Sequence, residues 1–300
     1  MSMVNGEVSH DKKLQQILAI KSKRTMAPGE LTFAWISRVV IWLVILLMII
    51  PIWFVIEASF NPSNSYFTVT VFPPHASFYN YVQLFTTTQF GVWVRNSLIV
   101  GLTVGIGQVL LTATSAFAFS RLRFWGRKYG LMTLLILQMF PNFLAIAAIY
   151  TGLSKLGMMD NLGSYILVML GGSAFNIWLL KGYFDSVPRD LDEAAIIDGA
   201  NSWQRFVQIL LPLAVPMLVV IFLFTLMGAF SEYILAGTIL QSPQNYTLGV
   251  GLYGLISGQF AKNWGEFAAA ALLSALPLAV IFGLLQRYVA SGLVAGSVKG

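Results

Sequence analysis

Few residues in this sequence could act as catalytic groups or ligands, and the residue types that are missing exclude several classes of function. The chain has no cysteine and only two histidines, His10 and His75, both outside the apolar runs. Without cysteine there can be no disulfide, no thiolate nucleophile and no thiolate metal site. The sequence also lacks a GxxxxGK[ST] loop, the motif that binds nucleotide phosphates. We therefore predict no catalytic residue, no metal site and no cofactor bound by this chain.

Acidic residues are densest in one segment, from Ser186 to Pro212. Its acids are Asp190, Asp192, Glu193 and Asp198. Ser186 can cap a helix, Pro188 suits the first helical turn, and early acids stabilise the positive end of a helix. Gly199 suits a helix C′ position, where glycine adopts a positive φ easily. We expect a short helix, a turn, and a second helix that begins near Ser202.

One face of the first of these helices carries small side chains and is bordered by acidic residues. Leu191, Ala194 and Ala195 share one side by the i, i+3, i+4 spacing. Two alanines let this face approach another protein closely. Glu193 flanks the face, with Asp190 and Asp192 close by, which implies a basic partner surface. The plainer alternative is an amphipathic connector that lies on its own helical bundle. Residue types alone leave both interpretations open.

The composition of the chain indicates a membrane protein. Hydrophobic residues make up 57% of the 300 residues and charged residues only 10%, against roughly 45–50% and about 25% in soluble proteins. Six apolar runs are long enough to cross a bilayer as helices. They lie near residues 39–57, 96–119, 129–152, 163–183, 213–235 and 266–288. The predicted fold class is an all-α polytopic membrane protein with six transmembrane helices.

Basic residues set the orientation of these spans. With six spans both termini lie on one side, and the positive-inside rule selects the cytoplasm. This assignment leaves only Arg95, Lys155 and Lys262 of the 18 basic residues outside. Because most of the cations lie beside apolar runs, the net charge of +6 indicates topology and not nucleic-acid binding.

The same spans divide the chain into segments. The predicted segments are 1–36 (cytoplasmic N-terminal segment), 37–60 (first transmembrane helix), 61–92 (external loop), 93–290 (core with the other five helices) and 291–300 (cytoplasmic tail). Within the core we expect a cytoplasmic loop at 184–212 and an ordered external loop at 236–265.

The acidic segment carries a motif with a fixed spacing. It reads Glu193-Ala194-Ala195, three residues, Gly199, nine residues, Ile209, one residue, Leu211-Pro212. This pattern resembles the signature loop of the permease subunits of bacterial binding-protein-dependent ABC importers. The resemblance implies the type I importer permease fold, also called MetI-like, and makes the loop a coupling helix that docks into a cleft of a cytoplasmic ATPase. It further implies that Glu193 pairs with a basic ATPase residue, that Ala194 and Ala195 make the close contact, and that Gly199 sets the turn.

Other stretches resemble the second permease of maltose-type sugar importers. They are Gln138–Pro141, Lys181–Phe184, Gly265–Pro277 and the terminal Gly296–Gly300. The similarity runs from about residue 39 to residue 300, whereas residues 1–36 form a longer extension than that subunit leads us to expect.

The resemblance also implies partners. The external loop Gln241–Trp264 would reach into an extracytoplasmic sugar-binding protein, and the tail residues Val298, Lys299 and Gly300 would contact the ATPase. The chain would pair with a second, related permease through its fourth to sixth helices, and with two copies of a P-loop ATPase that bind the ATP and magnesium. We expect a multi-pass protein of a bacterial or archaeal cytoplasmic membrane. Maltose or maltodextrin is the first substrate expectation, with galactosides, the substrates of multiple-sugar systems and alginate-like polymers left open.

Some side chains in the spans could contact a sugar. Sugars are usually held by aromatic faces and amide or hydroxyl groups in a mostly apolar cavity. The candidates by type are Gln108, Gln138, Asn142, Tyr150, Asn176 and Trp178. Hydrogen bonding between helices explains each of them equally well.

An ion-coupled carrier or a membrane enzyme is the competing class. Ion coupling needs ionisable residues within the spans, but Glu57 and Glu232 lie near the external ends, where we expect them to be hydrated. An enzyme should cluster a nucleophile, a base or metal ligands at one membrane face, and the sequence offers only scattered carboxylates. Alternating access in an importer permease is therefore the predicted function.

Overall fold

The computed structural model describes residues 28–62, 72–73, 75–139, 142–257 and 263–295. Within these ranges every regular element is helical, as the predicted all-α class requires. The chain divides into two units, Met1–Phe54 and Val55–Gly300. The helix α2 (Pro28–Phe60) crosses the boundary between them.

Helix α2 is apolar on every side. No residue of its most apolar 18-residue stretch is buried within the protein. A helix that is hydrophobic all round and long enough to cross a bilayer is stable when lipid covers it. The helix begins at Pro28, ahead of the predicted boundary at residue 37, so the last part of the predicted N-terminal segment is already helical.

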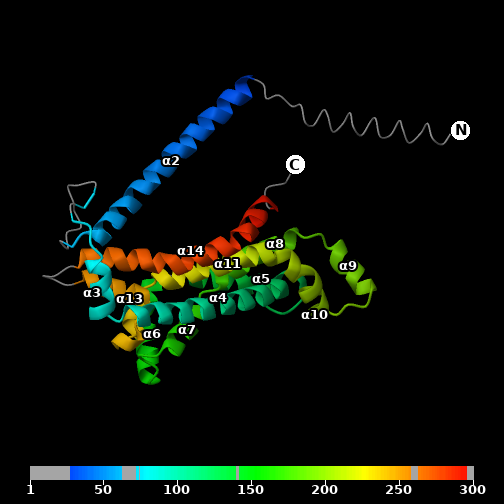
Figure 1. The fold of residues 1–300 in the computed structure, drawn as a ribbon. Coiled ribbons are helices and arrows are strands. Elements are labelled where there is room, and N and C mark those ends of the chain that lie inside the picture. The colour runs from blue at the N-terminus through cyan, green and yellow to red at the C-terminus, as the bar shows by residue number, and fades with distance from the viewer. Residues whose placement is uncertain (1–27, 63–71, 74, 140–141, 258–262, 296–300) are drawn as a thin grey trace. The chain divides into compact units, whose positions relative to one another are not determined.

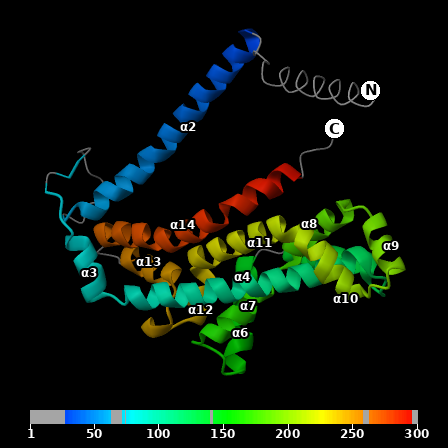
Figure 2. The same cartoon turned by 45° about the vertical axis from the view of Figure 1, so that its right-hand side comes forward.

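The second unit is built around the long helix α4 (Phe90–Arg121). This helix packs against α8 (Ala174–Ser186) and α11 (Leu211–Ser231), and α11 packs in turn against α14 (Trp264–Ala295). Figures 1 and 2 show α4, α11 and α14 side by side along the length of this unit. These contacts bury the aliphatic and aromatic core of the second unit.

Two glycines let α4 and α11 approach closely. A Cβ atom added at Gly101 would lie 2.7 Å from Leu226, and one added at Gly105 would lie 2.8 Å from Phe222. Small residues serve this purpose between membrane helices, where packing drives association. We therefore ascribe both glycines to helix packing.

Two of the predicted spans are broken, whereas the sequence predicted continuous helices. The third consists of α5 (Arg127–Gln138) and α6 (Asn142–Lys155), with residues 140–141 outside the described ranges. The fourth consists of α7 (Leu162–Leu170) and α8, which are bent by 44° across Gly171 and Gly172. Glycine has a low helix propensity, so the pair marks a natural break. By length and composition the described residues contain four membrane-crossing helices, or five with the bent pair.

The segments that the sequence predicts to be external fold into short helices. They are α3 (Tyr79–Thr87), α12 (Ile234–Ile239), the 3₁₀ turn η2 (Pro243–Asn245) and α13 (Leu248–Ile256). Asn96, buried near the start of α4, donates hydrogen bonds to the carbonyls of Gln244 (2.9 Å) and Tyr246 (3.0 Å). The segment between α12 and α13 is thereby held against the bundle.

Asp160, between α6 and α7, ties a second external loop to the same segment. One carboxylate oxygen accepts the backbone N–H groups of Gln241 and Ser242, both at 2.9 Å, and the other accepts the Ser242 hydroxyl. Asn245 donates to the Asp160 carbonyl at 2.7 Å. Burial alone would raise the pKa of Asp160, but the hydrogen bonds from Ser242, Asn245 and Gln241 outweigh it and lower the pKa to about 2. Asp160 has a φ of 56°, a left-handed conformation that aspartate tolerates better than most residues.

Candidate functional site

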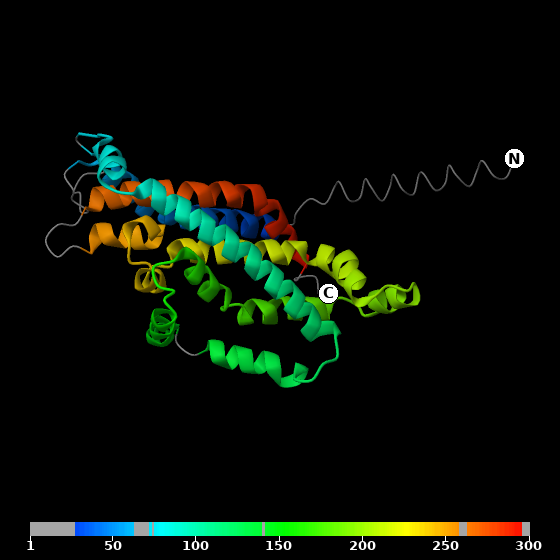
Figure 3. The same cartoon turned by 90° about the horizontal axis from the view of Figure 1, so that it is seen from below.

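The acidic segment forms a projecting helix at one end of the second unit. It contains α9 (Asp190–Ile197), the short α10 (Ser202–Arg205) and a π-helical turn, η1 (Phe206–Leu210), that runs directly into α11. Figures 1, 2 and 3 all place α9 at one end of this unit, with α3 and α13 at the other. The predicted pair of helices with a turn between them is therefore confirmed.

A buried ion pair anchors α9 to the end of α4. The Arg121 Nε atom lies 2.6 Å from a carboxylate oxygen of Asp192, and the two side chains are only 4% and 7% exposed. Arg205 approaches the other carboxylate oxygen at 3.7 Å. Arg121 also donates to the Val187 carbonyl at 2.9 Å. Asp192 thus faces its own chain, and the expectation that it forms part of a surface for a basic partner is wrong.

The loop is also closed at its base by a bond between its two ends. The Tyr183 hydroxyl, near the end of α8, donates to the Leu213 carbonyl in the first turn of α11 at 2.7 Å. Phe184 and Phe206 are both buried in the core cluster beneath the loop. The two helices that lead into and out of the loop therefore meet through a hydrogen bond and a shared apolar core.

The ends of α9 follow the sequence rules in part. The Ser186 hydroxyl donates to the Tyr183 carbonyl at 2.7 Å, so it finishes α8 and does not cap the next helix as predicted. Gly199 has a φ of +83° and its N–H bonds to the Ile196 carbonyl at 3.0 Å. The Ala200 N–H bonds to the Ala195 carbonyl at 2.8 Å, which completes a Schellman motif. The predicted role of Gly199 as the turn residue is confirmed.

The start of the second helix is fixed by Asn201. Its side chain accepts the Gln204 N–H at 2.9 Å, while the Gln204 side chain accepts the Asn201 N–H at 2.8 Å. This reciprocal pair is a capping box, which satisfies two backbone donors at a helix start. Ser202 is the first helical residue, as predicted.

The outer face of α9 is bare and largely apolar. Glu193 and Ala194 are exposed, and Ala195 is half-buried. Ile196 is 53% and Ile197 86% exposed. The sequence reasoning missed these two isoleucines; an apolar pair directly before a helix-ending glycine in a cytoplasmic loop was the available signal. Exposed aliphatic side chains beside an acid suit a surface that another protein covers.

Three motif positions meet around one hollow beside α9. The hollow has a volume of about 350 Å³, and Ala195, Gly199 and Ile209 are among its lining residues. Leu211 and Pro212 begin α11 directly after the π-helical turn. Proline lacks an N–H and its ring crowds the carbonyl four residues earlier, which the wider π turn relieves. The spacing of the motif thus places its distant members at one site.

The break in the fourth span is held by two glutamines. The buried Gln108 of α4 donates to the carbonyls of Met169 (3.2 Å) and Leu170 (3.1 Å) at the end of α7. Gln138 of α5 donates to the Gly172 carbonyl at 3.3 Å and accepts the Phe175 N–H at 2.7 Å. Side chains that satisfy freed backbone groups are what a broken helix needs inside a membrane.

A hollow of about 500 Å³ lies beside this break. Gln138, Gly171, Gly172 and Glu232 are among the residues that line it. Of the other sugar-contact candidates, Tyr150 and Trp178 are 43% and 49% exposed on α6 and α8. Asn176 is half-buried on α8, and Asn142 begins α6. The structure does not gather these candidates into one cluster with a common bonding partner among the described residues.

Of the two carboxylates near the predicted external ends, one is buried and not hydrated as expected, whereas the other, Glu232, is half-buried. Glu57 is only 3% exposed. Glu232 accepts hydrogen bonds from the Tyr165 hydroxyl (2.9 Å) and from the N–H groups of Leu235 (2.7 Å) and Ala236 (2.8 Å). The Glu232 carboxylate therefore caps the first turn of α12 by accepting these two backbone N–H groups.

Comparison with known proteins shows the family to which the chain belongs. The family described as "Binding-protein-dependent transport system inner membrane component" matches residues 108–294, which include the whole of α9 and its flanking helices. The chain belongs to this family. It is an inner-membrane permease, and the family match extends over the Glu193–Pro212 motif.

Relatives of this permease share most of its length. It is 42% identical over 258 residues to the galactooligosaccharides transport system permease protein GanQ of Bacillus subtilis (strain 168), covering 85% of this chain and 91% of that one. It is 37% identical over 287 residues to the maltose/maltodextrin transport system permease protein MalG of Vibrio vulnificus (strain YJ016), covering 89% and 96%.

A solved structure shows the same fold. A chain of a bacterial ABC transporter involved in the import of the acidic polysaccharide alginate matches with a TM-score of 0.73 at 21% identity, over 89% of this chain and 99% of that one. The predicted importer permease fold is confirmed.

Proposed function

We propose that this permease admits an oligosaccharide to the cytoplasm by alternating access, driven by a separate ATPase that docks on α9. The observation that carries the proposal is the contrast within α9 itself. Asp192 is buried against Arg121, which fixes the helix to α4, while Glu193, one residue later, is exposed beside Ile197. A helix anchored on one side and bare on the other suits the transfer of movement from a docked partner.

The motif residues have distinct parts in this docking. Glu193 would meet a basic residue of the ATPase, and Ala194 and Ala195 would permit close approach of its groove. Gly199, Ile209, Leu211 and Pro212 shape the turn and the return into α11. The tail residues Val298, Lys299 and Gly300 lie outside the described residues, and their contact with the ATPase stays a prediction. ATP and magnesium would be bound by two copies of the ATPase, which would carry out hydrolysis.

The names of the relatives support a proposed substrate class. GanQ and MalG are named for galactooligosaccharides and for maltose or maltodextrin. We infer that this permease takes a short oligosaccharide of one of these kinds. A sugar-binding protein would deliver it to the external segment that includes α13 and Gln241–Trp264. A second, related permease would complete the transport path, to which Gln138, Asn142, Tyr150 and Asn176 are the candidate contributors from this chain.

The test is an affinity purification of the tagged chain from its own membrane, followed by an ATPase assay of the recovered complex in lipid nanodiscs. We expect a second permease and a P-loop ATPase to co-purify, and ATP hydrolysis to rise when the sugar-loaded binding protein is added. Recovery of the chain alone, with sugar uptake into liposomes in the absence of ATP, would refute the proposal.

The docking residue is tested within the same complex. Glu193→Lys should lower the stimulated ATPase rate by tenfold or more and weaken ATPase recovery, because it places like charges together. Asp190→Lys is the matched control, since Asp190 is an exposed acid in the same helical turn that lies outside the motif. Equal losses in both variants would show that bulk charge matters and that Glu193 has no specific role.

A further inference from the structure

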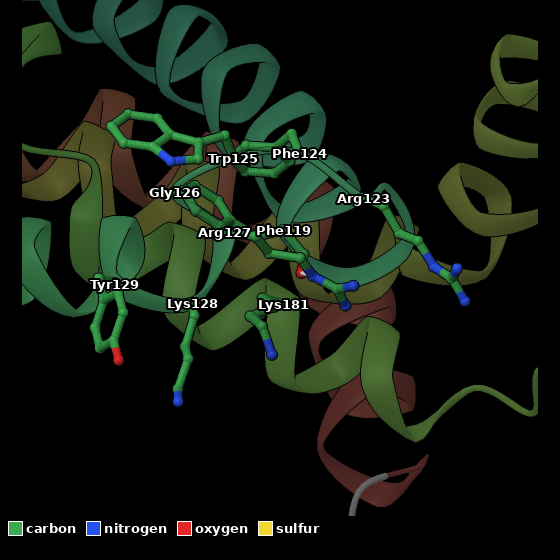
Figure 4. Close-up of a pocket in the computed structure, with 9 residues that line it drawn as sticks. All are labelled: Phe119, Arg123, Phe124, Trp125, Gly126, Arg127, Lys128, Tyr129 and Lys181. Carbon is green, nitrogen blue, oxygen red and sulfur yellow. Dashed lines mark hydrogen bonds between the residues drawn. The ribbon is translucent and has the colours of Figure 1, made fainter.

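A basic pocket lies where α4 turns into α5, close to the cytoplasmic end of α8. Its volume is about 910 Å³, and four of its lining residues are cations: Arg123, Arg127, Lys128 and Lys181. None of its lining residues is a carboxylate. Figure 4 shows the side chains of Lys128 and Lys181 extending to the same side, whereas Arg123 extends away from both.

Two of these cations already serve the protein. Arg127 donates to the carbonyls of Phe119 (2.9 Å) and Ser120 (2.7 Å), which closes the end of α4. Lys181 pairs with Asp185 on its own helix. The ion pairs among the described residues include neither Arg123 nor Lys128. Four positive charges in one pocket, with a single paired acid beside them, make a site of positive potential that favours an anion.

The pocket is also aromatic, since Phe119, Phe124, Trp125 and Tyr129 are among its lining residues. It belongs to the hairpin that joins two spans on the cytoplasmic side, where aromatic rings collect at the lipid headgroups. Trp125 is fully exposed, and Tyr129 is 64% exposed with its ring 5.3 Å from the Lys128 ammonium. A small soluble anion would leave these rings uncovered, whereas a lipid could place its charged headgroup among the cations and its apolar chains against the rings.

The surface beyond the pocket continues in apolar residues. Tyr129, Met132 and Ile136 follow the i, i+3, i+7 spacing, so they share one face of α5, and all three are exposed. This stripe leads from the basic pocket toward the membrane interior. It suits an acyl chain that runs along the helix from a headgroup held at the pocket.

We propose that this pocket binds an anionic phospholipid, with the headgroup held among the four cations of the pocket and an acyl chain along Tyr129, Met132 and Ile136. Basic pockets between membrane helices on the cytoplasmic side recognise such headgroups, and each cation strengthens the binding. Two lining residues of the pocket, Phe119 and Arg123, flank Arg121, the anchor of Asp192. A bound lipid therefore braces the end of α4 against which α9 is held.

The test is native mass spectrometry of the full-length chain, purified with its accompanying subunits, during titration with phosphatidylglycerol. We expect discrete phosphatidylglycerol adducts and no matching adducts with phosphatidylcholine. Arg123→Gln/Lys128→Gln should weaken adduct formation about tenfold or more, whereas the charge-preserving pair Arg123→Lys/Lys128→Arg should retain it. The measurement requires neither ATP nor sugar, so its result is independent of the proposed transport function.

The matched control removes the same two charges elsewhere at the cytoplasmic side. Arg38 and Arg287 also lie beside aromatic rings, Trp35 at 5.1 Å and Tyr288 at 4.8 Å, but neither lines the pocket. Arg38→Gln/Arg287→Gln should leave the adducts within about twofold of the unmodified protein. An equal loss in this control would overturn the proposal, because net charge alone would then explain the binding.

A second readout locates the lipid. Phosphatidylglycerol with brominated acyl chains should quench a component of the tryptophan fluorescence that is absent from Trp125→Phe. Equal quenching of both proteins would refute the proposed place of the chain. Displacement of the lipid by millimolar inorganic phosphate would show that the pocket takes a soluble anion, and exclusion of added lipid by a co-purifying protein would show a protein interface; either result would overturn the proposal.

Discussion

The two ends of the second unit both use an aspartate to hold a loop, and they use it differently. At the external end Asp160 accepts three hydrogen bonds from Gln241 and Ser242, so two loops are joined to each other. At the cytoplasmic end Asp192 fixes only the inner side of α9 and leaves its outer side uncovered. The loops joined by Asp160 therefore form a fixed surface, whereas α9 is fixed on its inner side and uncovered on its outer side.

The largest loss of stability should follow removal of the cytoplasmic anchor. Asp192→Ala leaves Arg121 buried without its carboxylate, and breaking a buried ion pair in this way costs about 3–5 kcal/mol. The midpoint of thermal unfolding of the purified protein should fall clearly. Asp190→Ala, an exposed acid two residues earlier, should change the midpoint little. Similar midpoints for the two variants would show that the ion pair does not hold the loop.

Substitutions at the break in the fourth span should cause the next largest loss of stability. Gln108→Leu leaves the Met169 and Leu170 carbonyls without their buried donor, which costs about 1–3 kcal/mol. Gln138→Leu should cost less, because Gln138 is only half-buried and water can replace it. The same unfolding measurement ranks the two variants, and the reverse order would contradict the assigned roles.

The hydrogen bonds of Asp160, here called the latch, should contribute less to stability than the Arg121–Asp192 ion pair. Asp160→Asn keeps the shape of the side chain but loses the charge that strengthens its hydrogen bonds, at a cost of about 1 kcal/mol. Limited proteolysis near Gln241 should become faster in the variant. Unchanged proteolysis would show that the hydrogen bonds from Asn96 suffice to hold this segment.

The latch also predicts a pH dependence. Because the pKa of Asp160 is lowered from 3.8 to about 2, its contribution is fully present above pH 3.8 and is lost as the pH falls through 2. Solvent screening limits the contribution to about 1 kcal/mol. Unfolding midpoints measured from pH 5 to pH 2 should therefore converge for the unmodified protein and Asp160→Asn. A constant difference over this range would argue against a lowered pKa.

The tip of α9 should give the smallest change in stability and a large change in function. Ile197→Asp alters a side chain that is 86% exposed, so the free energy of unfolding should change by about 0.5 kcal/mol or less. The stimulated ATPase rate of the complex should nevertheless fall by tenfold or more, since a charge would enter an apolar interface. A normal rate in this variant would remove Ile197 from the docking surface.

Local sequence rules predicted the turn of α9 well. Gly199 and Ser202 are where they were expected, because a Schellman turn and a capping box depend on neighbouring residues only. Ser186 was assigned wrongly for a related reason. A hydroxyl can finish one helix as readily as it can start the next, and nearby sequence does not distinguish these uses.

Long-range contacts explain what the sequence could not predict. Asp192 looked like a surface acid because its partner Arg121 lies in another span. The sequence also did not reveal that Gln108 and Gln138 bind backbone carbonyls at the break in the fourth span. In each case the partner of a polar side chain depends on how the helices pack, which periodicity does not reveal.

The hydrogen bond from Tyr183 to Leu213 has a mechanical consequence. Because this bond joins the end of α8 to the start of α11, a force on α9 would not simply separate these two helices. A movement of α9 would then be passed along α8 to the bend of 44° at Gly171 and Gly172. The loop and α8 would thus move as one rigid body. The bend, whose carbonyls accept hydrogen bonds from Gln108 and Gln138, would be the hinge for that movement.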